Sequence, residues 1–475
     1  MSASSESDLG KRLAAVLAHR LPGFESLLSM TQLSSGASQE TYRLAVRIDG
    51  NEHLLALRRA IKGAPKASIP WAPSIEAEAE LMTAARHAGV PSPEVHHVFR
   101  PEDGLGHGFI MQWLEGETLG SRIVRSEALA AARARLAYQC GEILGRIHSI
   151  DVSATGLERS LRRLTPAELL GYAIDWYGRF DVAHPMLEYA VRWLQTHLPS
   201  HDRMTLVHND FRNGNLVVGP TGIVAVLDWE HAFIGEPMRD LGWVCTNSWR
   251  FGRSDLPVGG FGTYDDLFAG YEAITGIRVD PAVIHFWEVF GAFWWAVGCL
   301  ELASQYHKGL DRGIERLAIE RRVSECEADC VNLLIPGTVS VTAPDIVPGT
   351  TPVETLALLE GVTAFLLNDI AVSQRNRTGY LARVAANTLE IVQRDLAQGP
   401  AARTAETARL QQLLSRRGSL LQLRRALVER LRHDPAAMTD PAIQSHLRAT
   451  AAAQIAIDQP RYSGLQIMLG REMSM

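Results

Sequence analysis

A dense group of polar side chains lies in the segment LVHNDFRNGNLVVGPTGIVAVLDWE, residues 206–230. Transfer of a phosphoryl group from a nucleotide to a hydroxyl needs a carboxylate that takes the hydroxyl proton and oxygen ligands that hold Mg²⁺ against the phosphates. We therefore interpret Asp210 as the candidate base and Asn215 and Asp228 as candidate magnesium ligands. Arg212 is a candidate to spread the charge of the transferring phosphate.

The alternative for this segment is a polar turn in which Asp and Asn side chains cap backbone groups. Its flanks favour the catalytic interpretation, because LVH before the loop and NLVV and IVAVLDW after it predict three short apolar strands. A hairpin between Asn215 and Asp228 would hold both metal ligands on rigid backbone.

The first hundred residues predict a small β-rich lobe. ETYRLAVRI and EHLLALRRA have strand character and are joined by a hairpin turn at 49–51, SIEAEAELMTAARHAG predicts a helix, and VPSPEVHHVF and GFIMQWLEG predict further strands. Ser35, Gly36 and Ser38 lie in a turn between two strands, where small residues let backbone N–H groups approach phosphates. With a single glycine, this turn taken by itself is better explained as an ordinary hairpin turn.

A nucleotide site in this lobe needs a cation for the phosphates. The strand LLALRRA contains no lysine, and Lys62 and Lys66 come after it, so Arg58 is the candidate, with Arg59 on the opposite face of the strand. A helical acid should pair with this cation. Three are available, and we favour the second, although the three could also form a solvated face: Glu76, Glu78 and Glu80.

The rest of the chain is predicted to be mainly helical. We expect an N-terminal helix over 1–24, a β-rich lobe over 25–115, a helical lobe over 116–335, an extended linker over 336–352, and an all-α bundle of about four helices over 353–475. The apolar stretch 283–300 is short for a bilayer span and contains His285 and Glu288, so it predicts a buried core helix.

The composition of the chain restricts the classes of binding partner and the cellular location that we expect. The net charge of -6 gives no support to nucleic-acid or membrane partners, and the N-terminus shows no targeting signal. Cys326 and Cys330 are better explained as neighbours on a helix than as half of a zinc site. We expect a cytoplasmic protein with reduced thiols.

Seven segments, in this order, resemble the aminoglycoside phosphotransferase and choline-kinase-like superfamily: LSSGASQETYRL, LALRRA, EAELMTAARHAGVPSPEV, GFIMQWLEGETL, LGRIHSID, LVHNDFRNGNLVV and VLDWEHAFIGEPMRDLGWV. They cover roughly 25–330. The likeness is greatest to kinase-like domains fused to acyl-CoA dehydrogenases. It implies an α+β, bilobal protein-kinase-like fold with ATP and Mg²⁺ between the lobes, and an acceptor that is a small-molecule hydroxyl compound, such as a hydroxy-acyl thioester.

The resemblance also implies roles for particular residues. Asp210 is similar to the family's base, Asn215 and Asp228 to its magnesium ligands, and Arg58 and Glu78 to its phosphate-binding ion pair. The backbone of Met111, Gln112 and Trp113 would bind adenine, and Asp240 would brace the catalytic loop. Three residues depart from the common pattern: Asn209 stands where Gly is frequent and would crowd the base, the strand cation is Arg58, and Arg212 replaces a His or Lys.

The C-terminal region resembles a helical domain of unknown function through RVAANTLEIVQRDL and DQPRY. Its arginine-rich composition suggests a docking or lid role, and it could form a homodimer.

Two hypotheses follow for the whole chain. One is an ATP- and Mg²⁺-dependent small-molecule kinase. The other is a catalytically inactive nucleotide-binding scaffold that acts through its helical tail. The aromatic segments GYAIDWYGRF and LGWVCTNSWRFGRSD would line an apolar or anionic substrate pocket, or else pack in the core.

Overall fold

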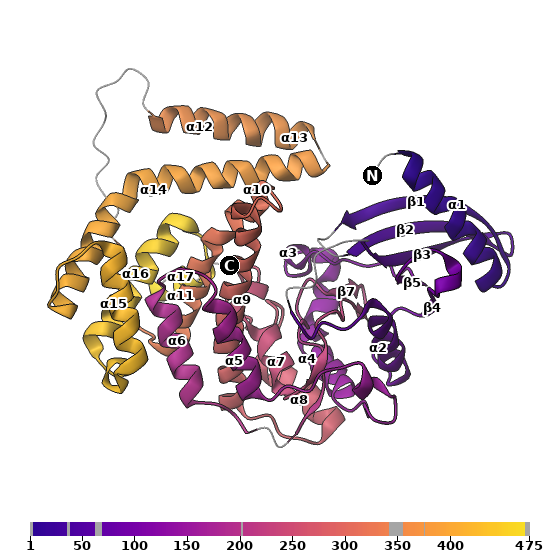
Figure 1. The fold of residues 1–475 in the computed structure, drawn as a ribbon, viewed down its shortest axis with the longest axis horizontal. Helices are drawn as coiled ribbons and strands as arrows, with labels where there is room; N and C mark the ends of the chain where they lie inside the picture. The colour runs from indigo at the N-terminus through magenta and orange to yellow at the C-terminus, as the bar shows by residue number, and fades with distance from the viewer. Residues whose placement is uncertain are drawn as a thin grey trace.

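The computed structural model describes residues 3–35, 39–61, 69–200, 203–341, 355–374 and 376–470. Figure 1 shows a small lobe with a sheet and a larger helical lobe next to it. Of the C-terminal helices, those over 420–458 lie on the far side of the larger lobe, and those over 355–373 run along its top. This arrangement confirms the predicted α+β, kinase-like fold class with additional C-terminal helices.

The small lobe contains a five-stranded antiparallel sheet in the order β1-β2-β3-β5-β4. The bounds are β1 Phe24–Ser35, β2 Gln39–Ile48, β3 Asn51–Ala60, β4 Val95–Val98 and β5 Gly108–Gln112, with helices α1 Ala3–Arg20 and α2 Ile75–His87. The β2–β3 turn has positive φ at Asp49 and Gly50, the backbone conformation that the predicted hairpin turn requires. Leu13 and Leu17 of α1 join Leu44 and Leu57 of the sheet in a separate small core.

The large lobe carries the polar loop on short strands. Thr205–Val207 (β6) pairs with Phe233–Gly235 (β9), and Leu216–Gly219 (β7) pairs with Gly222–Val226 (β8). The three predicted strands are present, and β9 is an addition. The helices of this lobe are α3 Gly120–Ile123, α4 Ala130–Ile147, α5 Pro166–Tyr177, α6 Pro185–Thr196, α7 Met238–Cys245, α8 Tyr264–Thr275, α9 Pro281–His307, α10 Ile314–Ala318 and α11 Val323–Leu334.

The segment that connects the lobes is itself paired with the loop-bearing hairpin. Glu117 N–H donates to the Val218 carbonyl (2.8 Å), and Val218 N–H donates to the Glu117 carbonyl (2.9 Å). The connection is therefore tied to β7, the strand that begins directly after Asn215.

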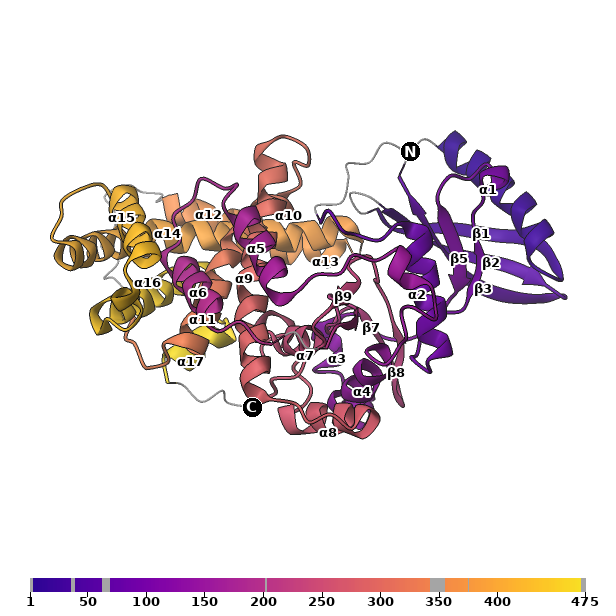
Figure 2. The ribbon, with the colours of Figure 1, turned by 60° about the horizontal axis from the view of Figure 1, so that its bottom comes forward.

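The C-terminal region is helical, as predicted. Its helices are α12 Thr355–Phe365, the π-helix Leu366–Ile370, α13 Ala371–Ser373, α14 Arg377–Leu414, α15 Leu420–His433, α16 Pro441–Asp458 and α17 Ser463–Met468. Residues 336–341 lack regular structure, and most of the predicted linker lies outside the described residues. Figure 2 shows α15–α17 beside α6, α9 and α11. Leu427, Ile443 and Met468 belong to the same hydrophobic core as Trp287 and Val331, so these helices extend the core of the large lobe.

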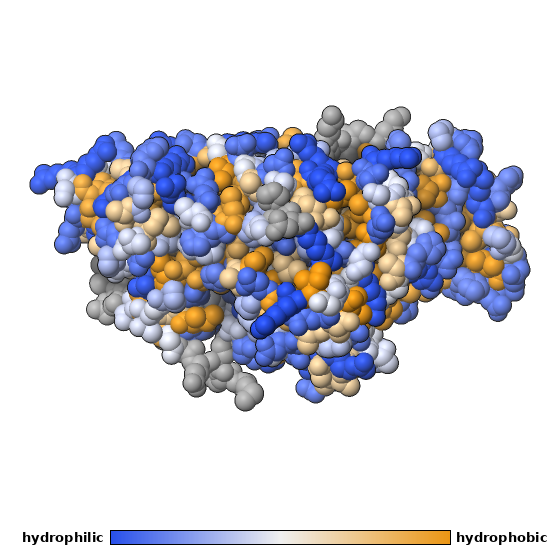
Figure 3. Space-filling model, turned by 90° about the horizontal axis from the view of Figure 1, so that it is seen from below, coloured by the Kyte–Doolittle hydropathy of each residue, from blue (hydrophilic) through white to orange (hydrophobic). Residues whose placement is uncertain are grey.

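Two helical stretches within the described residues are long and apolar enough to cross a membrane by length and composition. One is Pro281–His307, whose most apolar 18-residue window is 78% buried, in agreement with the predicted core helix. The other is Thr355–Ser373, whose corresponding window is 11% buried. On the face seen in Figure 3, hydrophilic residues are interspersed with smaller hydrophobic patches.

Candidate functional site

The loop after β6 is held by one buried carboxylate. Asp240, fully buried in α7, accepts hydrogen bonds from the backbone N–H groups of His208 (2.8 Å) and Asn209 (2.7 Å). Its Oδ2 also lies 3.1 Å from Nε2 of His148 on the C-terminal end of α4. Burial alone would raise the pKa of Asp240, but His148 and these donors lower it. The bracing contacts expected for Asp240 are therefore present.

Asp210 lies at the centre of a set of hydrogen-bond donors. Its Oδ1 accepts from Trp243 Nε1 (2.8 Å) and Arg212 Nε (3.0 Å), and its Oδ2 accepts from Asn215 Nδ2 (2.6 Å). Only 9% of the residue is exposed. This geometry fixes the positions of both carboxylate oxygens, as the positioning of a base requires.

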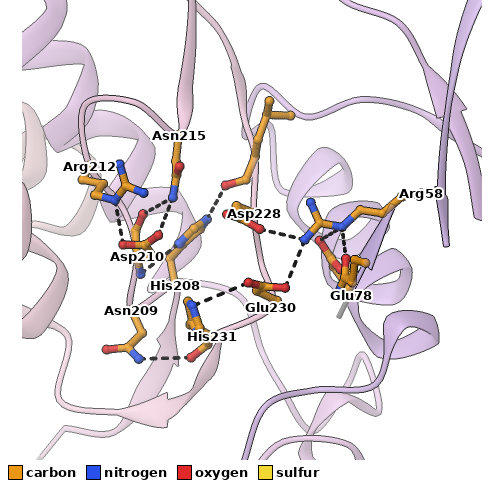
Figure 4. Close-up of polar contacts among 12 residues, drawn as sticks. Arg58, Glu78, His208, Asn209, Asp210, Arg212, Asn215, Asp228, Glu230 and His231 are labelled. Atoms are coloured by element: carbon orange, nitrogen blue, oxygen red, sulfur yellow. Dashed lines mark hydrogen bonds and ion pairs between the residues drawn. The ribbon is translucent and has the colours of Figure 1, made fainter. Parts of the chain in front are cut away.

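Asn215 and Asp228 lie at the open end of the β7–β8 hairpin, just before β7 and just after β8. The Asn215 carbonyl accepts from Leu227 N–H (2.9 Å), and the Leu227 carbonyl lies 3.1 Å from His208 Nε2. These contacts join the loop to the chain just before Asp228. In Figure 4, Asp210 and Asp228 lie on either side of His208, whose Nε2 contacts the Leu227 carbonyl.

Arg58 of β3 pairs with three carboxylates, one in its own lobe and two in the large lobe. Its Nε lies 3.2 Å from Glu78 Oε1, and its Nη2 lies 2.7 Å from Asp228 Oδ1 and 3.3 Å from Glu230 Oε2. Figure 4 shows this ion-pair network between the lobes. Of the three candidate acids only Glu78 contacts Arg58 within the described residues, since Glu76 instead pairs with His107 (2.6 Å).

The electrostatics of this network depend on burial and on Arg58. Burial raises the pKa of Glu78 to about 7, against the opposite effect of Arg58. Burial also acts to raise the pKa of Asp228, but Arg58 outweighs it and the pKa is lowered. Burial and the charge of Asp228 raise the pKa of Glu230. Arg58 itself, although desolvated, has a raised pKa because the three carboxylates stabilise its cation.

The predicted nucleotide-binding residues are only partly described. Gly36 and Ser38 lie outside the described residues, and of Ser35 only the backbone at the end of β1 is described. Met111 lies at the end of β5, opposite Ala56 of β3. Trp113 follows the strand, and its Nε1 donates to Glu115 (2.8 Å).

Asn209 does not crowd the base, which corrects the expectation from the sequence. Its φ of 65° lies in the left-handed region, which explains why glycine suits this position and why asparagine is tolerated. Its Nδ2 donates to the His231 carbonyl (3.2 Å), and Figure 4 shows this side chain directed away from Asp210.

The aromatic segments separate into two groups. Trp249 lies under the Arg212 guanidinium, with 4.4 Å between the guanidinium carbon and the ring centroid, so it borders the candidate base. Tyr172 and Trp176 of α5 instead pack with Trp71 and Trp294. The second group supports the interpretation as core packing.

Sequence reasoning missed two contributors to the site. Glu230 could have been identified, because it is an acidic residue only two positions after Asp228. Trp243 gave no such signal, because its contact with Asp210 depends on how α7 packs.

The donor set suits a hard cation. An amide oxygen of Asn215 and the carboxylates of Asp228 and Glu230 are the oxygen ligands that Mg²⁺ takes, together with water and phosphate. Within the described part of the chain, no group of three or more His, Cys, Asp or Glu side chains could hold a metal by itself. Cys326 and Cys330 are buried neighbours on α11, as expected.

Comparison with known proteins matches residues 372–462 to a domain of unknown function, DUF6285. The chain is 30% identical over 232 residues to mouse acyl-CoA dehydrogenase family member 10, covering 46% of this chain and 20% of that protein. It is 30% identical over 248 residues to chicken acyl-CoA dehydrogenase family member 11, covering 49% and 30%. The match thus spans less than a third of the length of either relative.

A solved structure of a Ralstonia eutropha protein assigned to the aminoglycoside phosphotransferases has the same fold. It superposes with a TM-score of 0.54 at 21% identity, over 66% of this chain and 95% of that one. The model of the phosphotransferase enzyme family (APH) matches residues 29–277, which is more than half of the chain. With its bilobal fold and with Asp210, Asp228 and Arg58 gathered between the lobes, this chain belongs to the phosphotransferase enzyme family.

Proposed function

We propose that this protein is an ATP- and Mg²⁺-dependent small-molecule kinase that transfers the γ-phosphate to a hydroxyl. The observation that carries the proposal is the position of Asp210, whose carboxylate is held by Arg212, Asn215 and Trp243, while Asp228 at the end of the adjoining hairpin pairs with Arg58 of the Arg58–Glu78 ion pair. Family membership supports the reaction class.

In the proposed reaction, Asp210 orients the acceptor hydroxyl and takes its proton. The acceptor oxygen forms its bond to the γ-phosphorus while the bond from that phosphorus to the oxygen bridging to ADP breaks. Asn215 and Asp228 would hold Mg²⁺, which when bound supplies neutralisation of the phosphate charge. Arg58, anchored by Glu78, would bind the α- and β-phosphates, and Arg212 would lie close to the transferring group.

For the acceptor, we propose a hydroxy-acyl thioester or a related metabolite. Two observations support an apolar or anionic compound: Trp243, Trp249 and Arg212 surround the candidate base, and two relatives are named acyl-CoA dehydrogenases. A polycationic antibiotic would require acidic side chains at that place. The free, buried cysteines support our proposal of a cytoplasmic location.

We also propose that the C-terminal helices mediate a homodimer. Leu358, Val362 and Phe365 of α12 are 61%, 50% and 53% exposed. Their spacing of four and three residues is that of a seam between packed helices. A second copy of α12 offers the same seam, so the pairing would be self-complementary.

The test of the kinase proposal is a phosphorylation screen on hydroxy-acyl compounds with labelled ATP. We expect Mg²⁺-dependent product with the wild-type protein, a loss of at least a thousandfold in kcat in Asp210→Asn (an order-of-magnitude expectation from the role of a base and its neighbours), and retained nucleotide affinity. Asp228→Asn should lose the Mg²⁺ dependence of nucleotide binding. Asp265→Asn, on the exposed face of α8, is the matched control. Nucleotide binding without Mg²⁺ dependence and without turnover would instead favour the inactive scaffold.

A further inference from the structure

Arg239, in the first turn of α7, is a fully buried arginine without a direct polar partner. It is 0% exposed, and within the described residues none of its three guanidinium nitrogens has a hydrogen-bond partner. Burial lowers the pKa of Arg239 to about 10, so the side chain stays charged at neutral pH. A buried charge that lacks a partner is costly, and such a group calls for compensation.

Three aromatic rings supply part of this compensation. The guanidinium carbon lies 4.6 Å from the ring centroid of Trp243, 5.1 Å from that of Phe290 and 5.9 Å from that of Trp287. The electron-rich faces of aromatic rings attract cations, and the attraction is stronger where water is excluded. We call these three rings the aromatic box of Arg239.

Nearby carboxylates supply the rest of the compensation for this buried charge. Asp240 and Asp210 are the carboxylates that counteract the burial of Arg239. Other ionisable groups near α7 include His148 and His208, whose pKa values are lowered by burial, and Glu236, which accepts a hydrogen bond from Trp287 Nε1 (2.5 Å). Arg203 also acts on Glu236, and Arg212 pairs with Asp210 (3.0 Å), so Arg239 is one of several cations beside these buried carboxylates.

Trp243 connects this cation to the candidate base. It lies one turn after Arg239 on α7, so one face of its ring meets the guanidinium while its Nε1–H, at the ring edge, donates to Asp210 Oδ1. A cation on the ring face draws electron density from the indole and makes its N–H a stronger donor, an effect enhanced by a low local dielectric. The second donor to the same oxygen, Arg212, lies on the catalytic loop itself.

We propose that Arg239 is a positioning residue for the reaction: through the Trp243 ring it orients the indole N–H toward Asp210 and places a positive charge behind the base. The proposal rests on the proposed function for its kinetic consequences. Its structural part concerns a hydrogen bond that can be observed without turnover.

The kinetic test compares Arg239→Met, which keeps the length of the side chain and removes its charge, with Arg239→Lys, which keeps the charge. We expect Arg239→Met to lower kcat roughly tenfold, less than the loss of a donor in direct contact with the reacting group, with an unchanged KM for ATP. Arg239→Lys should restore most of the lost kcat, and Arg425→Met, an exposed arginine paired with Asp181, should leave kcat and KM unchanged.

A double-mutant cycle tests the route through the ring. Trp243→Phe keeps the packing and removes the N–H donor, so Arg239→Met should add little to its effect on kcat. Full additivity of the two substitutions would overturn the route through Trp243.

The spectroscopic test needs no substrate. The indole ¹H–¹⁵N resonance of Trp243, assigned by its loss in Trp243→Phe, should shift toward that of a free indole in Arg239→Met and should keep its position in Arg239→Lys. An unchanged resonance in Arg239→Met overturns the proposal, even if the kinase proposal holds. A shifted resonance in a protein that phosphorylates nothing supports the positioning role and refutes the proposed function. If Arg239→Met does not fold, the same Trp243 resonance is compared in Arg239→Lys and Arg239→Gln. It should keep its position in Arg239→Lys and shift in Arg239→Gln, and an unchanged resonance in Arg239→Gln overturns the proposal.

Discussion

Arg58 Nη2 and Asp228 Oδ1 lie 2.7 Å apart, although the two residues belong to different lobes. This ion pair joins the strand that we propose to bind phosphate to the hairpin that we propose to bind the metal. A nucleotide between the lobes would compete with Asp228 for the Arg58 guanidinium, and a metal ion would compete with Arg58 for Asp228. Nucleotide and metal binding should therefore be coupled.

Arg58→Met should weaken the binding of a non-hydrolysable ATP analogue by at least about tenfold, because the substitution removes the charge and leaves Glu78 buried without its cation. Isothermal titration calorimetry measures this directly. Arg59→Met is the matched control, since Arg59 is the next residue on β3 and its side chain faces Glu40 instead (3.7 Å). Equal losses in the two variants would contradict the assignment of Arg58.

Tyr462→Phe should loosen the attachment of the C-terminal helices. The Tyr462 hydroxyl donates to Asp329 Oδ2 (2.7 Å), and Asn247 Nδ2 donates to Asp329 Oδ1 (2.7 Å). Removal of the hydroxyl leaves a buried carboxylate with one donor fewer, and we expect a loss of about 1–3 kcal/mol in the free energy of unfolding. Thermal unfolding checks this value, with Tyr138→Phe on the surface as the control.

The same pair predicts a pH dependence. Burial raises the pKa of Asp329 to about 7, so the folded protein retains a proton that the unfolded chain releases near pH 4. The stability that this proton provides is present at low pH and is lost as the pH rises through 7. Tyr462→Phe should therefore cost more at pH 8, where the carboxylate is charged, than at pH 6. A pH-independent difference would show that Asp329 does not titrate in this range.

His446 of α16 should make the C-terminal helices sensitive to acid. Burial, together with Arg409 and Arg424, lowers the pKa of His446 to about 4. Between this pKa and the ordinary value near 6.5, the unfolded chain binds a proton that the folded chain does not. The free energy of unfolding therefore falls as the pH is lowered through this window, by up to about 3 kcal/mol. His446→Leu should stabilise the protein at pH 5 and have a smaller effect at pH 8. Denaturant unfolding measures both, and the exposed His433→Gln should show no such contrast.

Val362→Glu together with Phe365→Glu should abolish the proposed homodimer, because two charges would then face the partner helix without compensation. Sedimentation velocity should show a dimer for the wild-type protein and a monomer of unchanged helical content for the variant. Glu360→Gln, on the same helix and exposed, should stay dimeric. A monomeric wild-type protein at micromolar concentration would refute the interface.

Much of the molecule follows from local pattern. The alternation in 40–60 and the turn at Asp49–Gly50 predicted the hairpin correctly, because side-chain period and turn chemistry act within a few residues. The spacing of Asp210, Asn215 and Asp228 pointed to one site for the same reason, since a short hairpin joins them.

What the sequence by itself determined was thus the identity of the elements and of the loop that carries the candidate chemistry. Only the tertiary structure decided which groups surround Asp210 and Arg58. Trp243 contacts Asp210 because of the way α7 packs, and Glu230 and Asp228 both pair with Arg58. Tyr462, which directly precedes α17, contacts Asp329 of α11. These contacts join residues that are distant along the chain, and their existence depends on the burial of whole helices against one another, for which no short stretch of sequence carries a signal.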